Sequence, residues 1–146
     1  MYNCVDNSKV RASYIVAFCS EQQGLFCESE ALTHSAIRSN VLPLLYGICD
    51  GDGALIGRIV EFIRAKRQIS MGTYMSYFTL AGLMKHGEEE LARDLTLDEG
   101  CWLNMIKEGG TTAFEAWGKE QKWNTSLFHP WSVAPLIIFA KDCKIH

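Results

Sequence analysis

Residues 54–66 read ALIGRIVEFIRAK, and this stretch decides the fold class. Its apolar residues recur three or four positions apart, which places them on one face of a helix with about 3.6 residues per turn. Leu55, Ile59 and Ile63 lie on that face, so we expect their side chains to be buried. The basic cluster at 64–67 comes at the end of the helix, where cations favour the negative end of the helix dipole.

Helical patterns also occur on both sides of this stretch. We expect further helices over residues 9–19, 33–46, 74–85, 88–94, 98–107 and 132–141. Gly24 and Gly47 suit the left-handed turns that end the first two of these helices. Ser132 is expected to cap the last helix, which puts Pro135 in the first turn, where its missing N–H breaks no helical hydrogen bond.

Strand signals are weak, because no run of alternating β-branched residues occurs. We therefore expect an all-α fold of helical hairpins, in a single domain over residues 1–146. Stacked helix pairs also form solenoids, but no segment resembles another at a fixed period and the loops differ in length. A solenoid is the weaker interpretation.

Composition and charge exclude several classes of function. The chain has 146 residues, of which 48% are hydrophobic and 21% charged, as in a globular domain. A net charge of −3 gives no electrostatic reason to expect nucleic acid as a partner. No apolar run is long enough for a signal peptide or a membrane span, so we expect no membrane partner. The chain is expected to be cytoplasmic if expressed as it stands, whereas the location of a longer parent protein stays open.

Six cysteines are present, and no two of them form a C-x-x-C pair. Most lie within or beside apolar helical stretches, so we expect buried or half-buried free thiols. His34, His86 and His146 show no metal-ligand spacing. We therefore expect neither a metal site nor a cofactor.

Residues 109–135 differ in composition from the helices around them. They contain three tryptophans, the carboxylate of Glu115 and the imidazole of His129 among small residues, in an expected loop between two helices. Indole faces stack on pyranose rings, polar groups bind their hydroxyls, and a carboxylate can activate water. The composition is therefore typical of a carbohydrate site.

The order of residues in this segment is more specific than its composition. Residues 109–117 read GGTTAFEAW, and residues 126–135 read SLFHPWSVAP. This pair resembles the C-terminal signature of bacterial α-L-rhamnosidases with a six-hairpin, (α/α)6 barrel. In that family a Gly-(Ala/Gly)-Thr-Thr-x-x-Glu-x-Trp element precedes a Ser-x-x-His-x-Trp-Ser-x-x-Pro element. The segments at 33–47 and 102–105 are also similar to the family, and the resemblance extends over nearly the whole chain.

The resemblance implies an inverting glycoside hydrolase that removes terminal α-L-rhamnose from rhamnose-containing glycosides. In such a reaction one carboxylic acid protonates the leaving oxygen and a carboxylate about 6.5–9.5 Å away activates water. The resemblance implies that Glu115 is this general base and that His129 contacts the sugar with Trp131 beside it. Of Trp117 and Trp123, we expect one to pack in the core and the other to line the substrate cleft.

The chain also departs from the family. The family's general acid lies in an acidic motif far upstream, and no counterpart is found here. A six-hairpin barrel needs twelve helices and usually has accessory β-domains, whereas six or seven helices and no such domains are expected. We therefore expect the C-terminal half of a barrel, inactive alone, that self-associates or binds a partner chain. The alternative is a non-catalytic helical module that binds a sugar or another protein.

Overall fold

The structure, a computed structural model, describes residues 7–30 and 34–140. Within these residues it is helical, with one isolated β-bridge between Cys19 and Phe26 and no strand. The α-helices are α1 (Asn7–Phe18), α2 (Ile37–Leu45), α3 (Gly53–Lys66), α4 (Thr73–Lys85), α5 (Glu89–Thr96), α6 (Trp102–Lys107) and α7 (Ala134–Phe139). Single 3-10 turns occur at Gln68–Ser70, Lys119–Gln121 and Pro130–Ser132. The predicted all-α class is confirmed.

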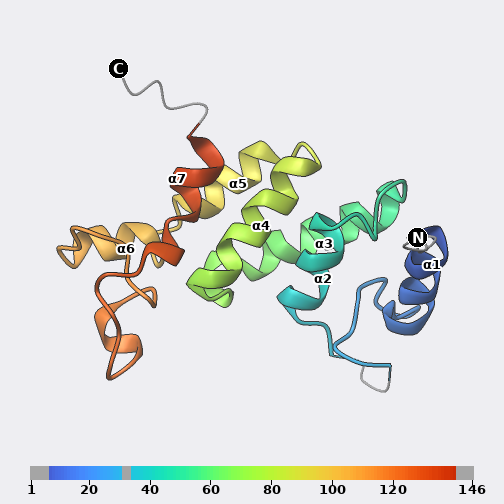
Figure 1. Cartoon of the computed structure of the whole chain (residues 1–146), viewed down its shortest axis with the longest axis horizontal. Helices are drawn as coiled ribbons and strands as arrows, with labels where there is room; N and C mark the ends of the chain where they lie inside the picture. Colours follow the sequence, from blue (N-terminus) through green and yellow to red (C-terminus); the bar gives the residue numbers. More distant parts are fainter. Residues whose placement is uncertain (1–6, 31–33, 141–146) are drawn as a thin grey trace, which may run out of the picture.

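The helix α4 occupies the centre of an elongated molecule, with α1 at one end and α6 at the other (Figure 1). It packs against α2, α5, α7 and the turn Pro130–Ser132. Small residues on α4 allow these close contacts, since a Cβ on Gly82 would already touch Leu44 of α2 at 3.4 Å. The hydroxyl of Thr79 is buried but still hydrogen-bonded, because it donates to the carbonyl of Met75, one turn earlier.

The apolar face of α3 behaves as its spacing predicts. Leu55, Ile59 and Ile63 are all buried in the main core. Asp52 caps the helix, because its carboxylate accepts a hydrogen bond of 2.9 Å from the backbone N–H of Leu55. The end of the helix carries Arg64 and Lys66, in agreement with the predicted dipole interaction.

Two helices, α6 and α2, begin four residues later than predicted. The helix α6 begins at Trp102 rather than at residue 98, because the carboxylate of Asp98 accepts a hydrogen bond from the N–H of Gly100 and forms a local turn. The helix α2 begins at Ile37, four residues later than predicted, and Thr33 lies outside the described residues. The helices α1, α3, α4 and α5 start and end within two residues of their predicted ranges.

The predicted cap of the last helix is wrong. Ser132 ends the 3-10 turn that Pro130 begins, and its hydroxyl is buried with no partner among the described residues. The helix α7 instead follows Val133, which offers no side-chain cap. Pro135 does lie in the first turn, as predicted.

The buried apolar residues form two clusters. The larger one joins α2, α3, α4, α5 and α7, and the smaller one consists of Cys101, Met105, Phe114 and Trp117. The indole of Trp102 packs against both clusters. The smaller cluster lies under the 109–135 segment, so the loop with the predicted site has a core of its own.

The cysteines within the described residues are free thiols. Cys27, Cys49 and Cys101 are buried and Cys19 is half-buried, as predicted. Burial raises the pKa of Cys49 to about 12, which keeps that thiol protonated at neutral pH. The cysteines at positions 4 and 143 lie outside the described residues.

No helix among the residues described is long and apolar enough to cross a membrane.

The buried face of α3 leads to a stability prediction. Ile59→Ala removes a fully buried side chain and should lower the free energy of unfolding by about 2–5 kcal/mol. Urea unfolding followed by circular dichroism measures this change. Ile106→Ala is the matched control, since Ile106 is also helical but 67% exposed, and should change stability by less than about 0.5 kcal/mol. Equal losses for the two variants would show that α3 does not form the core.

Candidate active site

Backbone hydrogen bonds bring the two halves of the sequence motif together. The N–H of Glu115 donates to the carbonyl of Ser126, and the N–H of His129 donates to the carbonyl of Ala113, both at 2.8 Å. The two segments therefore run antiparallel and side by side. This pairing places the carboxylate and the imidazole in one neighbourhood, although they are far apart in the loop.

Two glycines start this arrangement at the end of α6. Gly109 has a φ of +80°, a conformation that other residues rarely adopt. At Gly110 a Cβ would lie 2.7 Å from the carbonyl oxygen of Met105, so a larger residue does not fit there. The hydroxyl of Thr112 then donates to the carbonyl of Leu127 at 2.6 Å, which ties the turn to the opposite segment. The Gly-Gly-Thr-Thr element therefore sets the direction in which the chain reaches Glu115.

The loop is anchored to the start of α4. The hydroxyl of Thr73 donates to the backbone carbonyl of Glu115 at 2.8 Å, and the indole N–H of Trp117 donates to the carbonyl of Met71 at 2.6 Å. Phe114 and Trp117 are buried on either side of Glu115 in the sequence. Glu115 is thus held by core residues before and after it.

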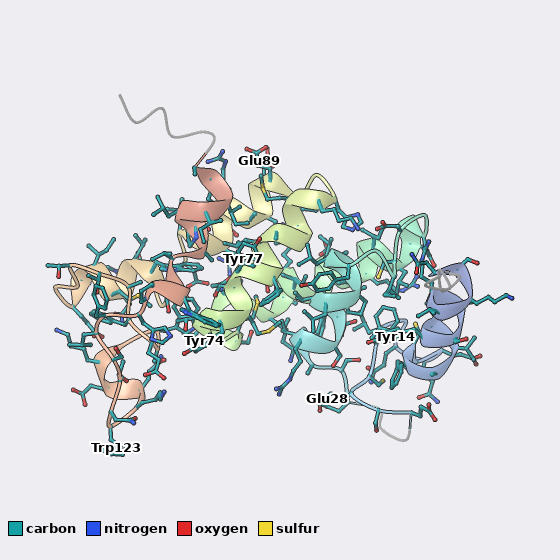
Figure 2. The ribbon with its side chains drawn as sticks, viewed as in Figure 1. Tyr14, Glu28, Tyr74, Tyr77, Glu89 and Trp123 are labelled. Carbon is teal, nitrogen blue, oxygen red and sulfur yellow. The ribbon has the colours of Figure 1, made fainter. Side chains whose placement is uncertain are left out.

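The structure separates Trp117 from Trp123. Trp117 is 3% exposed and packs edge-on against Trp102, with ring centroids 4.8 Å apart. Because its N–H is also bonded to the backbone, Trp117 packs in the core and does not reach a substrate in this conformation. Trp123 is 97% exposed and lies at the outer end of the loop, well away from Tyr74 (Figure 2). Trp123 therefore lies in solvent, apart from the aromatic side chains of α4, and its predicted place in a substrate cleft stays a prediction.

Both carboxylate oxygens of Glu115 have a hydrogen-bond donor. Lys122 Nζ lies 2.6 Å from Oε1, and the backbone N–H of Ser126 donates to Oε2 at 3.2 Å. The hydrogen bond from Lys122, the amide of Ser126 and the charge of His129 together lower the pKa of Glu115. Glu115 is therefore ionised at neutral and weakly acidic pH, and its side chain remains 22% exposed to solvent.

The imidazole of His129 lies against an aromatic surface. Its ring is edge-on to Tyr74 with centroids 5.1 Å apart, and Tyr74 is in turn edge-on to Trp131 at 5.9 Å. His129 Nε2 is buried and has no hydrogen-bond partner among the described residues. The indole of Trp131 is 73% exposed. His129 and Trp131 are thus brought together with a tyrosine that sequence reasoning missed, since Tyr74 lies on α4 and outside the motif.

An apolar groove of about 320 Å³ adjoins these rings. It is lined by Tyr74, Tyr77, Phe78, Pro130, Trp131, Ala134 and Ile137, and none of these side chains is charged. Tyr74 and Tyr77 are labelled on α4 in Figure 2. Because Tyr74 contacts both His129 and Trp131, the groove and the predicted sugar-binding residues form one continuous surface.

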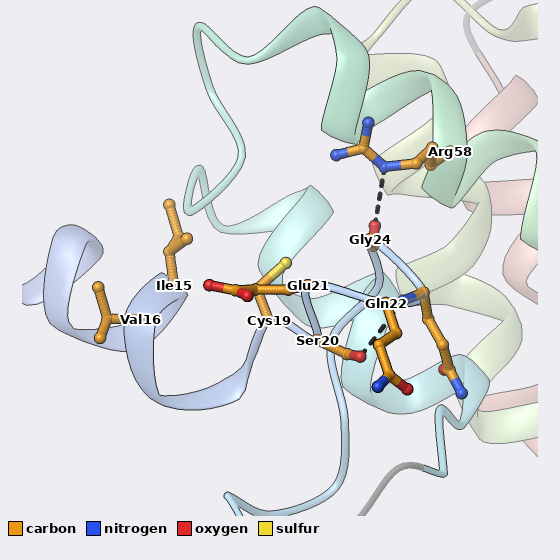
Figure 3. A pocket seen from close by; sticks show the side chains of 9 residues that line it. Ile15, Val16, Cys19, Ser20, Glu21, Gln22, Gly24 and Arg58 are labelled. Carbon is orange, nitrogen blue, oxygen red and sulfur yellow. Dashed lines mark hydrogen bonds between the residues drawn. The ribbon is translucent and has the colours of Figure 1, made fainter.

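A larger pocket of about 560 Å³ lies elsewhere, between the end of α1, the following loop and α3 (Figure 3). The guanidinium Nε of Arg58 donates to the carbonyl of Gly24 at 3.0 Å across it. Glu21 is the carboxylate that lines this pocket, and none of the predicted site residues does. Although this pocket is larger than the apolar groove, it is not the candidate active site, because it contains none of the predicted site residues.

Comparison with known proteins agrees with the motif. The family model of the bacterial alpha-L-rhamnosidase 6 hairpin glycosidase domain matches residues 5–141. No curated protein and no solved structure matches the chain. The match covers nearly the whole chain, including both halves of the paired motif and the helices that hold them. The chain therefore belongs to the bacterial α-L-rhamnosidase six-hairpin glycosidase domain family, a family of glycoside hydrolases.

Proposed function

We propose that this chain is the part of an inverting α-L-rhamnosidase that carries the general base, Glu115. The observation that supports this role is the ionised, oriented carboxylate beside the imidazole of His129. A general base must be deprotonated when the substrate binds, whereas a general acid needs a raised pKa. The lowered pKa of Glu115 therefore favours the base over the acid.

The carboxylate keeps room for a water molecule. Two carboxylate oxygens offer about four acceptor sites. Lys122 and the amide of Ser126 use two of these sites, and the side chain is still partly exposed. Glu115 would take a proton from this water as the water attacks the anomeric carbon of the rhamnose, with inversion at that carbon.

The neighbouring rings supply contacts for the sugar. The imidazole of His129, which lies against Tyr74 and whose buried Nε2 has no partner among the described residues, would bind a sugar hydroxyl once a shift of the neighbouring rings exposes that atom. The exposed indole of Trp131 would stack on the apolar face of the pyranose. Trp117 and Trp123 have no part in this proposal, since one is buried and the other lies far out on the loop.

We propose that the general acid comes from outside this site. The groups that shift the pKa of Glu115 are Lys122, Ser126 and His129, and none of them is a carboxylic acid. Six hairpins contain twelve helices, whereas the described residues form seven α-helices. We propose that further helices bring the acid and cover the apolar groove, and that the chain alone is inactive.

A non-catalytic role is the second candidate. The exposed side chains of Trp131 and Phe128 and the apolar groove favour binding of a sugar or a protein even without an acid. Hydrolysis by the complete protein distinguishes the two candidates, because this chain alone is expected to release no product in either case.

Glu115→Gln tests the catalytic role in the complete enzyme, in which the general acid is present. The amide keeps the shape of the side chain but accepts no proton from water, so turnover should fall by about 10²–10⁴-fold with little change in KM. Release of nitrophenol from a nitrophenyl α-L-rhamnoside measures this loss. Azide should partly restore turnover to Glu115→Ala, because it attacks without a base.

Glu120→Gln is the matched control for this experiment. Glu120 lies in the same loop, in the turn Lys119–Gln121, and is exposed. Its replacement should leave turnover unchanged. Near-normal turnover of Glu115→Gln would show that the carboxylate is structural.

The exposed apolar groove predicts that the isolated chain self-associates. Light scattering should give a mass above that of one chain, and Ile137→Glu should reduce it, because the charge enters the groove. Leu97→Glu is the control, since Leu97 is 63% exposed at the end of α5 and lies outside the groove. A monomeric chain with a sharp cooperative melt would contradict the half-barrel proposal.

A further inference from the structure

We propose that Lys122 is the positioning residue of this site, which holds the carboxylate of Glu115 in one orientation and in its charged form. The proposal rests on the proposed function of Glu115 as general base. Lys122 lies between the two halves of the sequence motif and belongs to neither. It acts through Glu115, at the distance of a hydrogen bond from Oε1.

The contact differs from an ordinary surface ion pair. Exposed ion pairs contribute little, because two long side chains have to be ordered for a small gain. Here the partner carboxylate is already fixed through its backbone by Ser126 and Thr73, and its second oxygen accepts the N–H of Ser126. Lys122 Nζ then binds the remaining oxygen at 2.6 Å. Each carboxylate oxygen thus has its own donor, which favours one orientation of the carboxyl group.

The backbone around Lys122 is fixed as well. The carbonyl of Lys122 accepts hydrogen bonds from both the N–H and the hydroxyl of Thr125, at 3.2 and 2.9 Å. The preceding residue, Gln121, accepts a hydrogen bond of 3.0 Å from the N–H of Trp117. Lys122 therefore starts from an anchored position, which reduces the entropy lost when its side chain binds Glu115.

The other lysine of this loop cannot take over the contact. Lys119 Nζ donates to the backbone carbonyl of Glu108 at 2.6 Å, and its N–H donates to a carboxylate oxygen of Glu108 at 2.8 Å. Of the groups that act on the pKa of Glu115, His129 is the other titratable one, and Ser126 contributes only an amide. Tyr74, from α4, faces His129. Without Lys122, Glu115 would therefore keep the neutral backbone N–H of Ser126 as a donor and the imidazole of His129 as a neighbour.

The consequence is a shift in the pH range in which the base works. Lys122 favours the charged carboxylate and lowers the pKa of Glu115. A group with a lowered pKa stays ionised until the pH falls through that lower value. Without Lys122 the pKa of Glu115 rises, so protonation inactivates the base at a higher pH.

A titration by nuclear magnetic resonance tests the proposal on the full chain without any need for turnover. The carboxyl carbon of Glu115, labelled with carbon-13 and assigned through Glu115→Gln, is followed against pH. In Lys122→Met its midpoint should move upward relative to the wild type, and in Lys122→Arg it should stay low, because arginine retains the charge. Lys119→Met is the matched control and should leave the midpoint of Glu115 unchanged, since that lysine binds Glu108.

Equal midpoints in the wild type and in Lys122→Met would overturn the proposal. Lys122→Gln repeats the test with a polar neutral side chain if Lys122→Met fails to fold, as judged by the indole signal of buried Trp117. In the complete enzyme, the acidic limb of the pH profile of kcat/KM should move to higher pH for Lys122→Met and return for Lys122→Arg. An unchanged limb would also overturn it.

The proposed function and the role of Lys122 can fail separately. Near-normal turnover of Glu115→Gln, together with a shifted midpoint in Lys122→Met, would refute the base and leave only the ion pair. A loss of turnover in Glu115→Gln, together with an unshifted midpoint of Glu115 in Lys122→Met, would support Glu115 as the base and refute the positioning role of Lys122.

Discussion

The hydrogen bond from the indole of Trp117 to the carbonyl of Met71 is the contact on which the site depends. It joins the loop to the residues that lead into α4, and α4 is the helix against which α2, α5 and α7 pack. A second indole bond, from Trp102 to the carbonyl of Ser132, fixes the other end of the loop at 2.7 Å. A buried N–H without a partner is costly, so these two bonds restrict the loop to one position on the scaffold. This anchoring of the loop fixes the positions of Glu115 and His129.

The charge of Glu115 is favoured by its contacts and not by burial. Glu115 keeps access to solvent and is surrounded by a lysine, an amide and an imidazole, all of which favour its charged form. An acid catalyst would need the opposite environment, with few donors and low solvent access. An ionised carboxylate, an imidazole nitrogen without a partner among the described residues and an exposed indole are the features that support the proposed binding of a sugar and activation of water. In the proposed function, this site supplies the general base of an inverting reaction.

The proposal that further helices bring a general acid would also account for the uncovered apolar groove. Tyr77, Phe78 and Ile137 line a surface that a soluble domain normally buries. In a family defined by six hairpins, the natural cover for such a surface is another hairpin. In the proposed function, the same hairpins bring the general acid to the sugar on the side opposite Glu115. The groove and the Glu115 site meet at Tyr74, so covering one would also complete the other.

The sequence by itself determined the features that depend on neighbouring residues. The spacing of Leu55, Ile59 and Ile63 defined the buried face of α3, because the helical period acts over a few positions. The family of the chain could be predicted from the paired motif, and its resemblance to that family made Glu115 and His129 the candidate site residues. Even the predicted helix starts were not all accurate, because local turns compete with the helix. The turn at Asp98 and the 3-10 turn at Pro130 moved two helix starts to later residues.

Only the tertiary structure decided which of the motif's side chains meet. Trp117 became a core residue because its indole reaches Met71, 46 positions earlier. Tyr74 joined His129 through packing of the loop on α4, and Lys122 joined Glu115 through folding of the loop on itself. No local spacing encodes these contacts. They follow from the close-packed arrangement of helices and from the need of each buried donor for an acceptor.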